Sequence, residues 1–144
     1  MAVADPTLTV RYSLSLPTVP ASVPQARRSV RAELAARGLA ADHPLTDAVL
    51  LVVSELVTNT VRHAAPRSPR TTLRLDFEPD ELTIRVHDRH PHCPSRRETP
   101  HQDGSGGWGL SLVHETALLA GGGTATLADP DGGGKTMVVR LPLV

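Results

Sequence analysis

The alternation of apolar and polar residues predicts where the strands lie. Apolar residues occupy every second position over residues 8–16, which is the period of a half-buried strand. Two further strands are predicted at Thr71–Glu78 and Leu82–Asp88, and the connection between them is short enough for a hairpin. The last two predicted strands, about Thr124–Ala128 and Lys135–Leu143, flank a turn rich in glycine and aspartate. We therefore expect five strands, four of them in two tight pairs.

Apolar residues that recur every three or four positions predict three helices. The first runs from Val23 to Arg37 and ends before Gly38, a natural C-terminal cap. The second begins near Pro44 and runs to about His63, and the third covers Leu110 to about Ala120. Because strands joined by tight turns pair antiparallel and three helices need a face to cover, the expected fold is an α+β two-layer sandwich. Its sheet is predicted to be mixed, mostly antiparallel and covered on one face by the helices, in a single domain over residues 1–144.

Composition narrows the classes of partner. The 144 residues carry 15 Lys+Arg against 15 Asp+Glu, so there is no basic surplus for nucleic acid. One Trp, one Tyr and one Phe are too few for a base-stacking platform. No apolar run approaches a membrane span, the first residues do not resemble a signal peptide, and the lone Cys93 excludes an internal disulfide. We expect a cytoplasmic protein with no direct nucleic-acid or membrane partner.

Histidine and cysteine residues around the aperiodic segment 89–107 form a candidate zinc site. They are His87, His90, His92, Cys93 and His101. Their spacing matches no closed structural zinc pattern, and the adjacent His92 and Cys93 are hard to direct at one ion. His87 is expected to point away from Asp88, because successive strand residues face opposite sides. A solvated, histidine-rich loop is therefore the favoured interpretation.

Glu55, Asn59 and His63 follow one another at intervals of four in the second predicted helix. This spacing puts all three on one face, beside the apolar stripe, so they should look into a cleft at the edge of the core. A carboxylate and a carboxamide one turn apart offer hard oxygen ligands for Mg²⁺, or a base beside a metal ligand. A solvated helix face is the alternative, since Glu and Asn are common there.

The segment Glu55-Leu-Val-x-Asn59-x-x-x-His63 resembles the N-box of the GHKL superfamily, which includes gyrase and the histidine kinases. It is more narrowly similar to bacterial anti-sigma factor kinases and related small actinobacterial ATP-binding regulators. The resemblance covers nearly the whole chain and implies a Bergerat-type ATP-binding fold. It further implies that Asn59 coordinates the Mg²⁺ bridging the ATP phosphates, that Glu55 is the base, and that His63 lies near the phosphates.

Asp88 fits the second motif of this family, in which an aspartate accepts a hydrogen bond from the adenine amino group. The family continues with a DxGxG turn, but residues 89–92 are Arg-His-Pro-His and contain neither glycine. Such glycines let the backbone approach the base and turn tightly without a Cβ. We therefore expect a different turn to close the adenine pocket, with Asp88 as an ordinary strand-end residue as the alternative.

The sequence Gly-Trp-Gly-Leu at residues 107–110 is similar to the family's GxGL motif and directly precedes a predicted helix. Glycines and a helix N-terminus put backbone N–H groups and positive dipole where phosphates could lie. The resemblance identifies a short, flexible ATP lid over about residues 89–109. The residues that it implies around the nucleotide are Gly104, Gly106, Gly107, Trp108, Gly109 and Leu110.

Thr136 fits the family's Gly-x-Thr motif, whose hydroxyl reaches the adenine through a water shared with the aspartate. The resemblance thus implies that Asp88 and Thr136 lie on neighbouring strands of one pocket. Gly134-Lys135-Thr136 is not the end of a Walker A motif, because the earlier glycine is replaced by Asp129 and no helix follows.

The resemblance implies a serine/threonine protein kinase of the anti-sigma type that depends on ATP and Mg²⁺. Such a protein phosphorylates a Ser or Thr of an anti-anti-sigma (STAS-type) partner and otherwise holds a sigma factor inactive; its relatives are often homodimers. Phosphoryl transfer relies mostly on positioning and charge neutralisation, so this small set of residues can suffice. We do not expect a full histidine kinase, because these 144 residues leave no room for a dimerisation helix with a phospho-acceptor histidine.

The missing glycines after Asp88 leave a second hypothesis open. It is a non-catalytic interaction module on the same fold, which binds nucleotide weakly or not at all and sequesters a protein partner. A Ser/His/Asp triad from Ser105, His114 and Asp88 is also conceivable, but no nucleophile elbow or oxyanion signature accompanies these residues.

Overall fold

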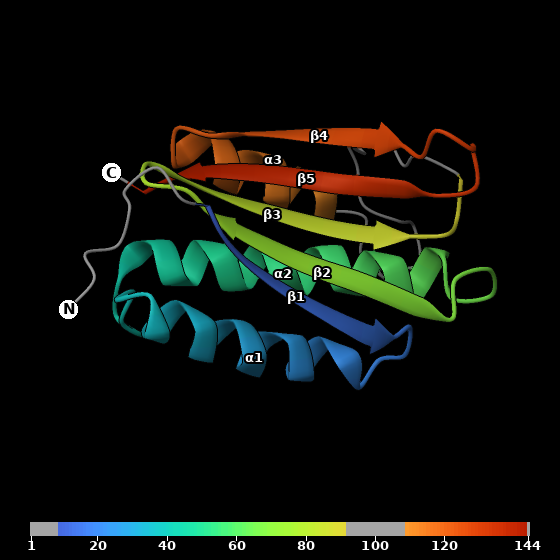
Figure 1. The fold of residues 1–144 in the computed structure, drawn as a ribbon, viewed down its shortest axis with the longest axis horizontal. Coiled ribbons are helices and arrows are strands. Elements are labelled where there is room, and N and C mark those ends of the chain that lie inside the picture. The colour runs from blue at the N-terminus through green and yellow to red at the C-terminus, as the bar shows by residue number, and fades with distance from the viewer. Residues whose placement is uncertain (1–8, 92–108, 144) are drawn as a thin grey trace.

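In the part of the chain that the structure describes, five strands form one sheet and three helices pack against one of its faces (Figure 1). The computed structural model describes residues 9–91 and 109–143. In chain order the elements are β1 (Val10–Pro17), α1 (Ser22–Ala36), α2 (Pro44–His63), β2 (Arg70–Phe77), β3 (Glu81–Asp88), α3 (Gly109–Leu119), β4 (Gly123–Ala128) and β5 (Lys135–Pro142). All eight elements lie within two residues of their predicted bounds, and the predicted α+β two-layer sandwich is confirmed.

The strand order is β1-β2-β3-β5-β4, and every described pairing is antiparallel. The sequence predicted a mixed sheet, and the order explains why no parallel pair forms. Strands β3 and β4 run in the same direction, but β5 returns from β4 and lies between them. The sheet remains open, with β1 and β4 at its edges.

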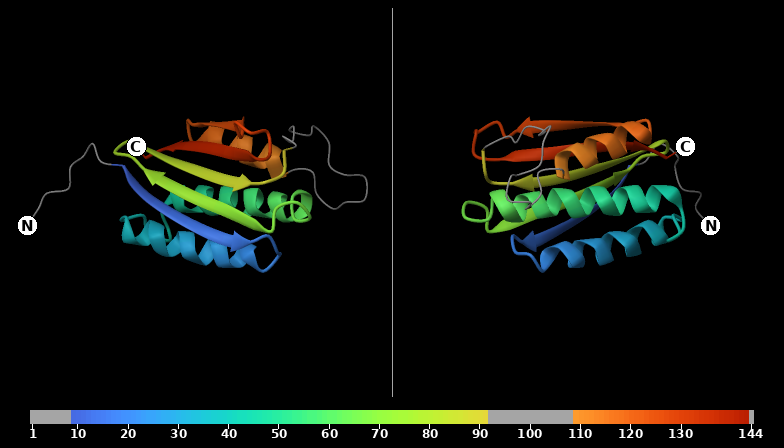
Figure 2. Two further views of the ribbon diagram at one scale, coloured as in Figure 1. Left: turned by 45° about the vertical axis from the view of Figure 1, so that its right-hand side comes forward. Right: turned by 180° about the vertical axis from the view of Figure 1, so that it is seen from behind.

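The core lies between the two layers, and Figure 2 shows the helices covering the sheet from behind. One cluster of buried residues joins all three helices to strands β1, β2, β3 and β5. Along β2, β3 and β5 the core residues occupy alternate positions, such as Leu73, Ile84 and Val139. This alternation fixes which strand residues face the helices and which face outward.

Helix α2 is the central helix of this layer, packed against α1 on one side and α3 on the other. It is the one described helix long and apolar enough to cross a membrane by length and composition. Nine of its residues are buried in the fold: Leu45, Thr46, Val49, Leu50, Val52, Val53, Leu56, Val57 and Thr60. Its apolar character is therefore explained by its position in the core.

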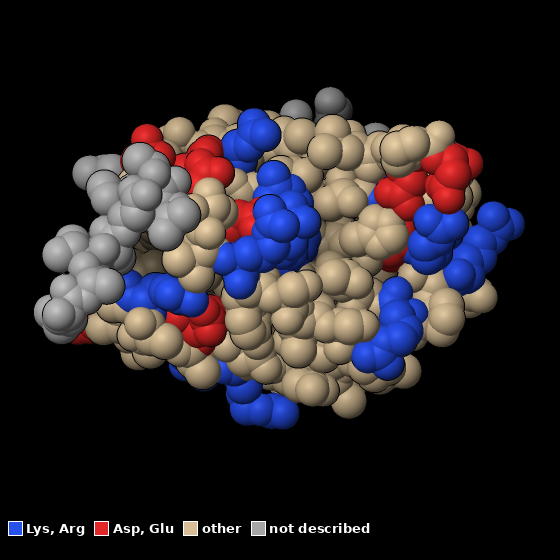
Figure 3. Space-filling model, viewed as in Figure 1, with Lys and Arg blue, Asp and Glu red and all other residues tan. Residues whose placement is uncertain are grey.

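The outward face of the sheet carries a cluster of arginines around one buried carboxylate. Arg11 on β1, Arg74 on β2 and Arg85 on β3 all pair with Asp76, whose side chain is almost fully buried. Figure 3 shows this face of the molecule, with basic side chains gathered near its middle. The group ties three neighbouring strands together on the side that the helices do not cover.

Candidate functional site

One end of the sandwich brings together the motifs that the sequence singles out. The last turns of α2, the first residue of α3, the end of β3 and the start of β5 all lie there (Figures 1 and 2). The loop after α2 also reaches this end, where the buried Ser68 accepts a hydrogen bond of 2.9 Å from the backbone N–H of Arg89. This hydrogen bond links the loop after α2 to the end of β3, two segments that are far apart in the sequence.

Glu55 is positioned by the packing of α2 against α3. It is half-buried, and its Oε2 lies 2.7 Å from where a Cβ on Gly109 would be. A glycine at the first residue of α3 therefore lets this carboxylate approach the helix backbone. Asn59, half-buried, and His63, exposed, follow on the same face at one and two further turns. The predicted row along α2 is confirmed as a geometric feature.

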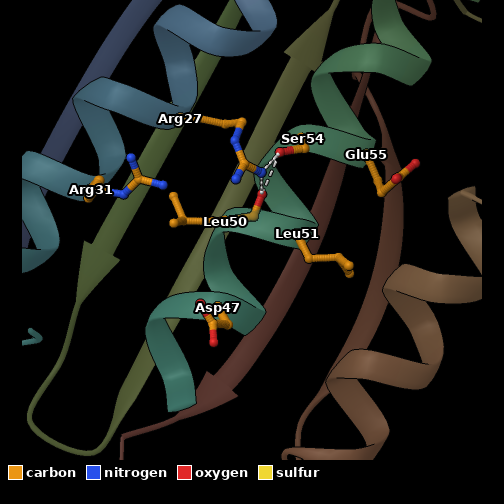
Figure 4. Close-up of a pocket in the computed structure, with 7 residues that line it drawn as sticks. All are labelled: Arg27, Arg31, Asp47, Leu50, Leu51, Ser54 and Glu55. Carbon is orange, nitrogen blue, oxygen red and sulfur yellow. Dashed lines mark hydrogen bonds between the residues drawn. The ribbon is translucent and has the colours of Figure 1, made fainter. Parts of the chain in front are cut away.

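Glu55 also ends a surface groove that runs across α2 from α1. The groove is lined by Arg27, Arg31, Asp47, Leu50, Leu51, Ser54 and Glu55. In Figure 4, Arg27 and Arg31 extend from α1, whereas Glu55 points toward the opposite side of α2. Arg27 donates hydrogen bonds to the hydroxyl of Ser54 and to the carbonyl of Leu50, which fixes the α1 wall of the groove. This groove lies between α1 and α2 and is not lined by Asn59 or His63, so the cleft expected in front of the whole row stays a prediction.

Asp88 forms a buried ion pair with Lys135. The Lys135 Nζ lies 2.9 Å from Asp88 Oδ1 and 3.3 Å from the carbonyl oxygen of His90. Asp88 is 1% exposed and Lys135 is 3% exposed, so the pair is shielded from water. The strand register places the two residues directly opposite each other on β3 and β5. A buried lysine is rare unless it is paired, and here its partner is the carboxylate that the family resemblance expects to meet the adenine.

The segment after Asp88 is held by hydrogen bonds rather than by glycines. The backbone N–H of His90 donates to Asp88 Oδ1 over 2.8 Å, which turns the chain at the strand end. The guanidinium of Arg89 pairs with Asp129 and Asp131 in the β4–β5 turn. A hydrogen bond from the backbone N–H of Gly133, followed by the contact with Arg89, lowers the pKa of Asp131 below its ordinary value. The chain after Asp88 thus turns without glycines, as expected, and the closing of an adenine pocket by this turn stays a prediction.

Thr136 does not share a pocket with Asp88. The two residues lie on neighbouring strands as predicted, but Thr136 pairs with His87, one position away from Asp88. Since successive strand residues face opposite sides, Thr136 lies on the outward face and Asp88 on the helix-facing side. The prediction of a shared pocket is therefore wrong, and Lys135 occupies the position facing Asp88.

The glycine-rich motif is described only at its end. Gly109 is the first residue of α3, and Leu110 is half-buried against the core. Four predicted residues lie outside the described part of the chain: Gly104, Gly106, Gly107 and Trp108. The placement of the lid over about residues 89–109 stays a prediction.

The two alternative sites, a zinc site and a Ser/His/Asp triad, receive no support from residues 9–91 and 109–143. In these ranges no group of three or more His, Cys, Asp and Glu side chains is arranged to hold a metal ion. His87 points away from Asp88, as predicted, and its Nε2 lies 2.8 Å from Asp129 Oδ2. His114 Nδ1 lies 3.1 Å from the hydroxyl of Thr124, so the triad of Ser105, His114 and Asp88 gains no described contact. His92, Cys93, His101 and Ser105 lie outside the described residues.

Two residues of this site were missed by the sequence analysis. Ser68 anchors the end of β3, and its position in a proline-rich loop gave no signal. Lys135 did carry a signal, because it alternates with Met137, Val139 and Leu141, which belong to or pack against the core. That alternation predicts an inward Lys135 and an outward Thr136.

The donors on α2 fit a magnesium–nucleotide ligand in their chemistry. Asn59 and Glu55 supply hard oxygen atoms one helical turn apart, and α3 begins with backbone N–H groups beside Glu55. Asp88 fits an adenine amino group less well, because its Oδ1 already accepts hydrogen bonds from Lys135 and His90 and the buried ammonium balances its charge. The end of the site formed by α2 and α3, which would hold the phosphates, therefore fits ATP better than the end at Asp88, which would hold the base.

Comparison with known proteins agrees with this geometry. The family model for the histidine kinase-like ATPase domain matches residues 16–118, which is more than half of the chain. The match extends from the end of β1 to the end of α3 and includes the row on α2 and Asp88. No curated protein matches the sequence.

Proposed function

The chain belongs to the histidine kinase-like ATPase domain family, and on this premise we propose that it binds Mg·ATP where α2, α3 and β3 meet. The observation that carries the proposal is the approach of Glu55 to the first residue of α3, with Asn59 one turn further along α2. Asn59 would hold the Mg²⁺ through its amide oxygen. The backbone N–H groups that open α3 would face the phosphates. When bound, Mg²⁺ neutralises charge on the phosphate oxygens.

We propose further that the reaction is phosphoryl transfer to a serine or threonine of a protein. The acceptor hydroxyl oxygen forms the new bond to the γ-phosphorus, the bond from that phosphorus to the β–γ bridging oxygen breaks, and ADP leaves. Glu55 accepts the hydroxyl proton. Its half-buried position supports this role, because a carboxylate that is partly open to solvent can be reached by a protein segment from outside.

The proposed partners follow from the similarity of the three motifs to anti-sigma factor kinases. The phosphoacceptor would be an anti-anti-sigma protein of the STAS type, and the protein held inactive would be a sigma factor. A homodimer would be the functional unit. The expected location is the cytoplasm, where both partners act.

A second candidate function is favoured by the ion pair between Asp88 and Lys135. A carboxylate whose Oδ1 already accepts two hydrogen bonds, and whose charge is balanced by a buried ammonium, gains less from a base than an unpaired carboxylate would. The chain would then be a non-catalytic interaction module that binds nucleotide weakly and sequesters a protein partner.

Titration calorimetry with Mg·ATP separates these two functions. We expect saturable binding that is lost on chelation of Mg²⁺ with EDTA, because the phosphate end of the site depends on the Asn59–Mg²⁺ contact. Transfer of labelled γ-phosphate to a STAS-type acceptor then tests the kinase. An absence of heat at millimolar Mg·ATP would favour the interaction module, and binding without transfer to any protein acceptor would contradict the kinase assignment.

The substitution Gly109→Ala tests the contact between α3 and Glu55. The new Cβ would lie 2.7 Å from Glu55 Oε2, so the carboxylate must rotate away from α3. Because the obstacle is the end of a flexible side chain, and because alanine favours helix, we expect stability to change by less than about 1 kcal/mol. Phosphoryl transfer should fall at least about tenfold, since misplacing a catalytic group by about 1 Å can lower the rate by up to two orders of magnitude.

Gly123→Ala provides the matched control, since a Cβ there meets no atom within 4 Å. Thermal unfolding and transfer rates would be measured for both variants. An unchanged rate in a folded Gly109→Ala protein would show that the position of Glu55 beside α3 does not matter for transfer.

A further inference from the structure

The pair formed by Lys135 and Asp88 changes what the base end of the site can recognise. Asp88 Oδ1 accepts hydrogen bonds from the Lys135 ammonium and from the backbone N–H of His90. Both charged side chains are almost fully buried, at 1% and 3% exposure. The register of β3 and β5 places them opposite each other, so the pair is built into the sheet.

A site selects an amino group when it presents a buried acceptor that would otherwise stay unpaired. An analogue that lacks the amino group is then rejected strongly, because binding it leaves the acceptor without a hydrogen bond. In this chain Lys135 already pairs with Asp88, so a nucleotide without the amino group leaves no unpaired carboxylate. Both hydrogen bonds end on Oδ1, so an amino group can approach only Oδ2 unless the pair separates, and separation would leave the Lys135 ammonium buried without its counter-charge.

The Lys135 ammonium itself favours a hydrogen-bond acceptor on the base rather than an amino group. An ammonium donates hydrogen bonds and cannot accept them, so it prefers a carbonyl oxygen to an amino group. The carbonyl of His90, 3.3 Å from Lys135 Nζ, shows that the ammonium already has an oxygen of this kind as a neighbour. A purine with an oxygen at position 6 could take the same role.

We infer that Lys135 removes the selection for a 6-amino group, so that this site takes a 6-oxopurine nucleotide at least as readily as ATP. The inference rests on the proposed function, because it requires Asp88 to be the group that meets the base. Lys135 is thereby a specificity-determining residue, and no motif of the sequence analysis had assigned it a role.

Inosine triphosphate is the appropriate probe, since it differs from ATP only in the oxygen at position 6 and the proton on N1. Titration calorimetry would give Kd for Mg·ATP and Mg·ITP with the unaltered protein. We expect the two constants to agree within about threefold, or ITP to bind more tightly, because neither nucleotide leaves the carboxylate without a partner and the ammonium favours an oxygen at position 6. A preference for ATP of more than about tenfold in the unaltered protein would overturn the inference while leaving the proposed function intact.

The substitution Lys135→Thr should create the missing selectivity. With Asp88 released, ATP should bind at least about ten times more tightly than ITP. Lys135→Arg, which keeps the cation, and Arg140→Thr, which removes an exposed cation from the same strand, should leave the ratio near its original value. A folded Lys135→Thr protein with an unchanged ratio would overturn the inference.

Removal of one partner of a buried pair is destabilising, so the fold of each variant would be checked by circular dichroism. If Lys135→Thr does not fold, the ratio measured on the unaltered protein still decides the question. If neither nucleotide binds to the unaltered protein, the proposed function fails, and the inference fails with it.

Discussion

Replacement of Asn59 by alanine is expected to abolish Mg·ATP-dependent phosphoryl transfer. Asn59 is the only asparagine in the chain and lies one turn beyond Glu55 on the same face of α2. Its amide oxygen is the proposed Mg²⁺ ligand, and alanine offers no oxygen in its place. Loss of a group that only supports a metal ligand lowers activity by about 10- to 100-fold, so loss of the ligand itself should exceed about a hundredfold.

Two further variants on the same helix make this result specific. Thr58→Ala removes a half-buried polar side chain from the adjacent position, which projects from a different face, and should leave transfer unchanged. Glu55→Gln should retain Mg·ATP binding but lose transfer, by about 10²- to 10⁴-fold, because the amide cannot accept the hydroxyl proton. Calorimetry and transfer of labelled phosphate would be measured on all three. Undiminished transfer by Asn59→Ala would remove the basis for the metal assignment.

The elements of this fold could be predicted from the sequence because each strand and helix carries a clear hydrophobic period. Helix α2 shows the strongest example, with buried residues repeating along its whole length. The hairpin of β2 and β3 could be predicted equally well, because a connection this short allows only an antiparallel pair. The fully antiparallel pairing of the sheet could not be predicted from such local patterns. It depends on β5 lying beside β3, a contact between segments far apart in the chain.

The candidate site, like the fold, could be predicted from the sequence only in part. The row of Glu55, Asn59 and His63 depends only on helical spacing, so the sequence predicts it directly. The base end of the site depends on strand register and on the face that each residue occupies. The motif similarity directed attention to Thr136, whereas the alternation of β5 with its inward Met137 and Val139 indicated Lys135. Where a motif and a period disagreed, the period was correct, because packing fixes the face of every strand residue.

The glycine run after α3 shows a further limit of pattern reasoning. The sequence does not distinguish the three consecutive glycines at residues 121–123, but the structure gives each of them a different environment. Gly121 has a φ of +88°, and its N–H donates to the carbonyl of Leu118 as α3 ends. The N–H of Gly122 donates to the carbonyl of Ala117 over 2.7 Å. A Cβ on Gly123 would meet no atom within 4 Å.

Replacement of Gly122 by alanine is expected to be the most destabilising of the three substitutions in this run. A Cβ at this position would fall on the carbonyl oxygen of Arg140, 2.8 Å from its carbonyl carbon and 3.3 Å from the Cα of Leu141. All three atoms belong to the backbone of β5, which the pairing with β3 and β4 holds on both sides. The obstacle therefore cannot rotate away as a side chain would. We expect a loss of about 3 kcal/mol or more, at the upper end for overpacking, and a fall in Tm of about 10 °C or more.

The neighbouring glycines supply the controls for this prediction. Gly121→Ala should lose about 1 to 2 kcal/mol, because a Cβ is strained at positive φ even though only the side chain of Pro142 lies near it, at 3.7 Å. Gly123→Ala should be neutral or stabilising by up to about 1 kcal/mol, because it reduces the freedom of the unfolded chain without a clash. Urea unfolding of the three variants would give this order directly. If Gly122→Ala proved no less stable than Gly123→Ala, the close approach of the α3–β4 connection to β5 would be wrong, and with it the seating of α3 that places Gly109 against Glu55.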